Sequence, residues 1–266
     1  MNSLIEARGV FKSFGQTPAL RGASVSVGRG EIFAIMGPSG SGKSTLLHCL
    51  AGIFTPDQGD VLFDGQTVNA MSEADRTKLR RTAFGFVFQF GQLVPELTAA
   101  DNVALPLLLN RTRRKVAYKT ADTWLERLGI GDKGGRRTGE LSGGEAQRVA
   151  VARALALAPK VIFADEPTGS LDSLTGEKVM ALMTELAREQ GATVVLVTHD
   201  ARIAAYADRV AMVSDGLVSA LDLSTVTASS TASSSTVPET TGSSTTGSSS
   251  TGSSTTGSST GANGAR

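Results

Sequence analysis

The 266 residues could form one large domain or two small ones, and a hydrophobic fraction of 40% is enough for a substantial core. Because 26 Lys and Arg nearly balance 25 Asp and Glu, the chain lacks the basic excess that drives sequence-independent binding to nucleic acid, and we expect no nucleic-acid partner. No apolar run approaches the roughly 18 residues of a membrane span, and residues 1–8 do not resemble a signal peptide, so we expect a cytoplasmic chain.

Short apolar runs alternate with helical patterns along the chain, which predicts an α/β domain with a largely parallel sheet. Near the start, residues 4–14 and 19–27 are typical of strands, and residues 61–65 of a strand entering a turn. The strongest strand predictions further along are 31–36, 84–88, 161–164, 193–198 and 209–213. Helices are predicted at 43–51, 118–128, 143–157, 173–190 and 201–206, and the region 89–139 is predicted to be a mostly helical subdomain.

The composition changes after about Leu223, and residues 223–266 are mostly Ser, Thr and Gly in near-repeats such as Thr241-Gly242-Ser243-Ser244. A segment with almost no large apolar side chains does not offset the backbone entropy of ordering, so we expect a disordered tail after a domain at 1–222. A linker or a modified tether is the alternative to a tail without specific function.

A phosphate-binding pattern follows the predicted strand 31–36 directly. Gly37-Pro38-Ser39-Gly40-Ser41-Gly42-Lys43-Ser44-Thr45 matches G-x-x-x-x-G-K-[ST] in a strand, loop and helix context. The glycines let backbone N–H groups surround phosphate oxygens, and the helix N-terminus adds partial positive charge. Lys43 adds a full charge for the β and γ phosphates, and Ser44 offers a hydroxyl ligand to Mg²⁺. The pattern predicts a P-loop nucleotide site; the alternative is a glycine-rich turn that binds nothing.

Two adjacent acids end the predicted strand 161–164. We expect Asp165 to reach Mg²⁺ and Glu166 to polarise an attacking water. Acids at a strand end are often only solvated, but the apolar run and the P-loop favour the catalytic interpretation.

A second glycine-rich motif opens the predicted helix 143–157. Leu141-Ser142-Gly143-Gly144-Glu145 combines a hydroxyl, exposed glycine backbone and a helix N-terminus, which together suit a γ-phosphate. An ordinary helix cap is the alternative. At these residues the chain resembles the ABC ATPase family, whose signature is L-S-G-G-[QE]. The resemblance implies that this motif binds ATP held by the opposite subunit of a homodimer.

The resemblance extends over about residues 5–221 and implies a P-loop NTPase core, an antiparallel β subdomain and a helical subdomain at about 90–140. It implies that Gln89 contacts Mg²⁺ and the attacking water and borders a transmembrane permease subunit. Ser170-Leu171-Asp172 resembles the loop that links the two sites of the dimer. His199 is similar to the switch histidine that contacts γ-phosphate and steadies the catalytic water. Phe14 stands where the family usually has a tyrosine that stacks on adenine, and stacking does not need the hydroxyl.

The segment 90–109 supplies an apolar surface next to Gln89, where related ATPases receive helices of a membrane subunit; the alternative is that its side chains pack the helical subdomain. With residues 164–169, this segment resembles the branch of lipoprotein-releasing, macrolide and peptide exporters and the cell-division ATPase. Two hypotheses follow: an ATPase that drives a transporter, and an ATPase that regulates a membrane partner without transport. DNA-repair and translation members carry second cassettes, coiled-coil insertions or basic arms, which this sequence lacks. The sequence does not name a cargo.

Overall fold

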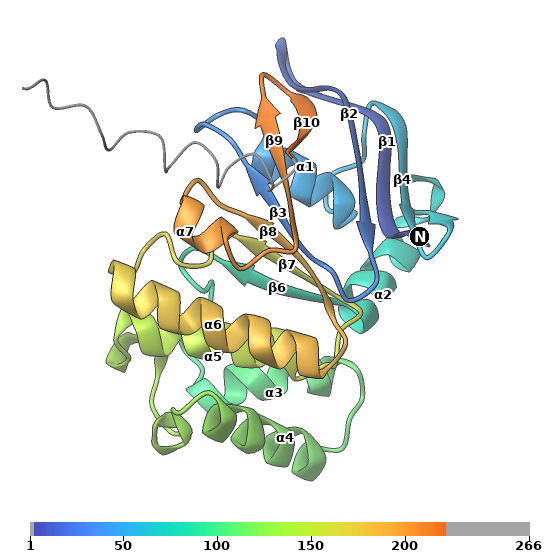
Figure 1. Cartoon of the computed structure of the whole chain (residues 1–266). Coiled ribbons are helices and arrows are strands. Elements are labelled where there is room, and N and C mark those ends of the chain that lie inside the picture. Colours follow the sequence, from blue (N-terminus) through green and yellow to red (C-terminus); the bar gives the residue numbers. More distant parts are fainter. Residues whose placement is uncertain (1–2, 222–266) are drawn as a thin grey trace, which may run out of the picture.

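The computed structural model describes residues 3–221, so the tail predicted at 223–266 lies outside the described residues. The larger of two sheets has five parallel strands and one antiparallel edge strand (Figure 1). Its spatial order is β10 (Leu217–Leu221), β9 (Arg209–Ser214), β3 (Ile32–Met36), β8 (Thr193–Val197), β7 (Val161–Asp165) and β6 (Phe84–Phe88). The central strands are apolar except for Asp165 at the end of β7 and Thr193 at the start of β8, because both faces of the sheet are covered.

The smaller sheet is antiparallel and has the order β2, β1, β4, β5. Its strands are β1 (Ser3–Phe14), β2 (Thr17–Gly28), β4 (Gln58–Phe63) and β5 (Gln66–Thr67). The core beneath it contains the apolar side chains of β1, β2 and β4, those of α1 (Lys43–Leu50), and one face of the parallel sheet. Alternation along β3 supplies that face with Phe33 and Ile35.

The opposite face of the parallel sheet, with Ile32 and Ala34 of β3, packs on helices. Figure 1 shows these helices in layers below the sheet: α5 (Gly143–Leu155) and α6 (Ser173–Glu189), then α3 (Ala99–Leu109) and α4 (Arg114–Arg127). The remaining helices are α2 (Glu73–Ala83) and the short α7 (Ala201–Ala204), and three single turns are η1 (Val68–Ala70), η2 (Gly131–Lys133) and η3 (Thr138–Glu140). None of the helices within residues 3–221 combines the length and apolar character that crossing a membrane requires.

The α/β class and all of the predicted strands are confirmed, with the main differences at strand ends. Among the elements that were not predicted are α2 and β10. Helix α2 is polar, and Ala83 is its only buried residue, so it has no apolar stripe to detect. The feature of the sequence that could have revealed α2 is its N-cap. Ser72 accepts a hydrogen bond from the amide of Asp75 and precedes an acidic first turn. Helix α4 begins at Arg114, four residues before the predicted start.

Candidate nucleotide-binding site

The loop between β3 and α1 curves into a cradle, in which the Ser41 amide donates to the carbonyl oxygen of Pro38 at 3.3 Å. Helix α1 begins at Lys43 after Gly42, whose φ is 105°, and no side chain caps its first amides. These amides are therefore available to an anion. Gly37 has φ 145°, and a Cβ there would lie 2.1 Å from the carbonyl oxygen of Val213, so only glycine fits against β9.

Two side chains at the start of α1 are held in place without a ligand. Lys43 is 7% exposed, and its Nζ donates to the carbonyl oxygen of Pro38 at 2.8 Å. Ser44 Oγ donates to Asp165 Oδ1 at 3.0 Å, across from the end of β7. Burial raises the pKa of Asp165, and the Ser44 hydrogen bond opposes that shift. Ser41 Oγ is buried without a hydrogen-bond partner among the described residues.

A polar cavity of about 390 Å³ opens above this loop. It brings together residues from five separate segments: Ala19, Ser39, Gly40, Gly42, Lys43, Ser44, Thr45, Gln89, Glu166 and His199. Sequence reasoning missed Ala19, because an alanine carries no chemistry that a motif could reveal. Asp165 lies behind Ser44 and does not line the cavity; neither do Gly37, Pro38, Ser41 and Phe14.

Glu166 and His199 face each other across the cavity, with Glu166 Oε1 and His199 Nδ1 2.8 Å apart. Glu166 has a φ of 47°, an uncommon conformation for a residue with a side chain. Its amide donates to the carbonyl oxygen of Val197 at 2.9 Å, which extends the pairing of β7 with β8. A carboxylate fixed in this way next to an imidazole can accept a proton from a water at the phosphate cradle.

The loop Ser170-Leu171-Asp172 lies next to Gln89. Ser170 Oγ donates to the carbonyl oxygen of Gln89 at 2.7 Å. A Cβ on Gly169 would come within 2.9 Å of Gln89 Nε2, so the two loops are in contact. Asp172 caps α6 by accepting from the amide of Thr175 at 3.0 Å, and hydrogen bonds at this cap lower the pKa of Asp172.

The motif Leu141–Glu145 lies outside this cavity, at the start of α5. Figure 1 shows α5 and α1 in separate regions of the molecule. Ser142 is the N-cap, and it forms a capping box in which Glu145 Oε2 accepts from the Ser142 amide at 2.8 Å and from Ser142 Oγ at 2.9 Å. Hydrogen bonds from Ser142 lower the pKa of Glu145. Within one chain, the structure does not bring this motif to the phosphate cradle.

Phe14 is the last residue of β1 and is 48% exposed. Its ring meets that of Phe54 edge-on, with centroids 5.3 Å apart, and Lys12 Nζ lies 5.8 Å from its centroid. His48 meets Phe54 edge-on at 5.2 Å, and burial lowers the pKa of His48. Sequence reasoning assigned no role to Phe54 or His48, since neither belongs to a motif.

The side chains around Ser44 fit a hard cation. The Ser44 hydroxyl, the Asp165 carboxylate and the Gln89 amide offer oxygen ligands of the kind that Mg²⁺ prefers. Within residues 3–221, no group of three or more His, Cys, Asp or Glu side chains is arranged to hold a metal.

Comparison with known proteins agrees with this geometry. The family model described as ABC transporter matches residues 20–169. The lipoprotein-releasing system ATP-binding protein LolD of Myxococcus xanthus (strain DK1622) is 47% identical over 221 residues, covering 82% of this chain and 99% of that protein. LolD of Porphyromonas gingivalis (strain ATCC BAA-308 / W83) is 44% identical over 215 residues, covering 81% and 98%. The dimeric post-hydrolysis structure of the ATP-binding cassette MJ0796, bound to ADP and Pi, is 39% identical with a TM-score of 0.75, covering 82% and 99%.

Proposed function

The chain belongs to the ABC transporter family as an ATP-hydrolysing nucleotide-binding subunit, and on that basis we propose that two copies close around ATP to drive a lipoprotein-releasing type of membrane transporter. The observation that carries the proposal is the split of the phosphate-binding groups. Lys43, Glu166 and His199 share one cavity, whereas Ser142 lies elsewhere on the same chain. A second copy is needed to bring a Ser142 to each cavity.

Within each cavity, different side chains bind the phosphates, accept the proton from water and stack on the adenine. Lys43 and the amides at the start of α1 hold the β and γ phosphates. Glu166 accepts a proton from the attacking water, and His199 orients both the Glu166 carboxylate and that water. Ser44, Asp165 and Gln89 would hold Mg²⁺, which supplies charge neutralisation for the phosphates when bound. Phe14 stacks on the adenine ring.

The opposite subunit completes the site with its signature motif. Ser142 and the amides of Gly143 and Gly144 form an anion receptor at the start of α5, suited to the γ-phosphate of the partner copy. The dimeric state of the related cassette with ADP and Pi supports this arrangement. Ser170 and Asp172 lie next to Gln89 and would report the state of one site to the other.

The membrane partner would dock in an apolar groove of about 570 Å³ beside β6, the edge strand of the larger sheet. Its walls are α2, β6 and the ends of α3 and α5; among its lining residues it has three arginines, Arg80, Arg81 and Arg153, and no acid. Ile53 and Leu109 expose 41% and 58% of their surface at its edge. Part of the segment 90–109 packs the core, including Val103 and Leu107, and its most exposed large apolar side chains are Phe90 and Leu109. A permease helix with apolar side chains and a carboxylate fits this groove.

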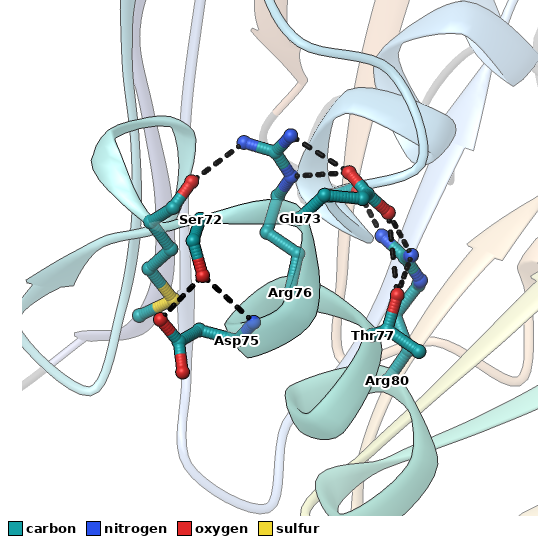
Figure 2. Close-up of polar contacts among 8 residues, drawn as sticks. Ser72, Glu73, Asp75, Arg76, Thr77 and Arg80 are labelled. Atoms are coloured by element: carbon teal, nitrogen blue, oxygen red, sulfur yellow. Dashed lines mark hydrogen bonds and ion pairs between the residues drawn. The ribbon is translucent and has the colours of Figure 1, made fainter.

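The wall formed by α2 is fixed to the P-loop helix. Figure 2 shows Glu73 between Arg76 and Arg80, at 2.7 and 2.6 Å from their guanidinium groups. Arg80 also donates to the carbonyl oxygen of Gly52, just after α1, and Arg76 donates to that of Met71 at 2.9 Å. A helix docked against α2 would therefore act on the element that carries Lys43.

The relatives named as lipoprotein-releasing ATP-binding proteins support transport over a purely regulatory role, and they support a lipid-modified protein as the cargo class. We place the subunit on the cytoplasmic face of the membrane, where ATP is available and where a permease would present its helices.

The test is Glu166→Gln, alone and combined with Ser142→Ala. We expect Glu166→Gln to bind ATP, hydrolyse it at least ~100-fold more slowly, and accumulate as a dimer. Adding Ser142→Ala should abolish the dimer but leave nucleotide binding to the monomer largely intact. Size-exclusion chromatography with ATP and a fluorescent-nucleotide titration measure both. Near-normal turnover of Glu166→Gln contradicts the assigned base, and lost monomer binding in the double variant contradicts a site shared between copies.

A further inference from the structure

Arg153 of α5 is partly buried, and none of the ion pairs within residues 3–221 includes it. Burial lowers the pKa of Arg153. Its Nη1 donates to the carbonyl oxygen of Gln92 at 2.8 Å, and its Nη2 donates to that of Gly91 at 2.7 Å. These two charge-assisted hydrogen bonds join α5 to the loop that follows β6.

The loop that Arg153 holds begins at Gln89. Gly91 and Gln92 both have a positive φ, 66° and 44°, which is uncommon for glutamine. This turn directs two successive carbonyls at one guanidinium. Two other side chains hold the same loop: Gln147 of α5, 2% exposed, donates to the carbonyl of Phe88 at 3.0 Å, and Ser170 donates to that of Gln89.

We propose that Arg153 is a positioning residue for Gln89, fixing the loop so that the Gln89 side chain reaches the nucleotide cavity. The inference rests on the proposed role of Gln89 in hydrolysis. Arg153 touches no nucleotide, since it lies outside the residues that line that cavity. It acts through the backbone between Gln89 and Gln92, and a planar fork suits two neighbouring carbonyls better than the point charge of lysine.

Arg153 also connects the docking groove to the catalytic cavity. Arg153 and Gln92 both line the groove, whereas Gln89 lines the nucleotide cavity. A carboxylate of a docked permease helix would compete with the Gly91 and Gln92 carbonyls for the same guanidinium. Docking in the groove then changes the position of Gln89 without any contact with ATP.

The test compares Arg153→Lys with Arg148→Lys in the full chain. Arg148 lies on the same helix and also donates to a backbone carbonyl, that of Leu128 at 2.9 Å, remote from Gln89. We expect Arg153→Lys to lower kcat about 10-fold, the lower end of the cost of losing an orienting contact, with the dissociation constant for ATP changed less than about threefold. Arg148→Lys should keep kcat within about twofold. Hydrogen exchange should become faster at amides 88–92 only in Arg153→Lys.

The variant Gln89→Ala distinguishes a failure of this inference from a failure of the proposed function. If Arg153 acts through Gln89, adding Arg153→Lys to Gln89→Ala causes no further loss of kcat. An unchanged kcat in Arg153→Lys, equal losses in both lysine variants, or additive losses in the double variant overturns the positioning role while Gln89 keeps its own. Full activity of Gln89→Ala refutes the proposed role of Gln89 and the inference with it. If Arg153→Lys does not fold, Arg153→Gln takes its place in each comparison.

Discussion

The contact between the P-loop and β2 yields a prediction that two neighbouring glycines can test. Gly40 and Gly42 both have a positive φ, 77° and 105°. A Cβ on Gly40 would meet nothing within 4 Å. A Cβ on Gly42 would lie 2.4 Å from the carbonyl oxygen of Ala19 and 3.2 Å from Leu20 Cδ2. The substitutions Gly40→Ala and Gly42→Ala therefore share a backbone cost, but only the second adds a collision.

The backbone cost of placing alanine at a positive φ is about 1–2 kcal/mol of unfolding free energy for either variant. The collision at Gly42 involves backbone on both sides, so the chain must shift, and overpacking of this kind costs about 1–3 kcal/mol more. At roughly 2–4 °C per kcal/mol for a domain of this size, Gly42→Ala should melt about 2–12 °C below Gly40→Ala.

Thermal denaturation without nucleotide, followed by circular dichroism, measures this difference and keeps ligand effects out of it. Equal melting temperatures for the two variants would contradict the close approach of the Ala19 carbonyl oxygen to Gly42. The positive φ of Gly42 would then be the remaining physical reason for a glycine immediately before Lys43.

Two further predictions concern polar groups outside the nucleotide cavity. Asn102 is fully buried and joins α3 to the preceding loop, accepting from the Val94 amide at 2.8 Å and donating to the Val94 and Thr98 carbonyls. Asn102→Ala should cost about 1–3 kcal/mol in urea denaturation with ATP affinity unchanged, and an unaltered midpoint contradicts this. Arg80 and Arg76 lower the pKa of Glu73 from its ordinary 4.5 to about 2. Because the folded pKa is depressed, the Glu73 carboxylate stabilises above pH ~4.5, and this contribution is lost as pH falls toward ~2. The stability difference between the wild type and Glu73→Gln should shrink over that range while both remain folded; a constant difference refutes the ion-pair network.

Short-range motifs predicted where the residues of the nucleotide cavity lie in the fold. The strand β3, the P-loop and α1 follow one another in sequence, so the local pattern determines where Lys43 and Ser44 lie. Glu166 and His199 could be placed because each follows a buried strand, and the carboxyl ends of parallel strands share one edge of a sheet. The sequence could not show that these two side chains meet, since the contact depends on the order of β7 and β8 in the sheet.

The contacts that hold Gln89 could not be predicted in the same way. Ser170, Gln147 and Arg153 donate hydrogen bonds to backbone carbonyls. Because every residue has a backbone carbonyl, the sequence does not reveal which one each side chain binds. The polar helix α2 was missed for a related reason: ion pairs and a cap stabilise it at the groove, and it has no apolar stripe.

The residues of the site differ in how firmly the fold holds them in position. Lys43, Glu166 and His199 follow the ends of β3, β7 and β8, three adjacent strands of one buried sheet, and they move only if that sheet deforms. Gln89 follows β6 at the edge of the sheet, and side chains from α5 and from the loop before α6 hold its backbone. Shifting those elements costs a few hydrogen bonds, whereas deforming the sheet costs its core packing. In the proposed mechanism, Gln89 is therefore the group through which a membrane partner or a second copy can most readily control hydrolysis.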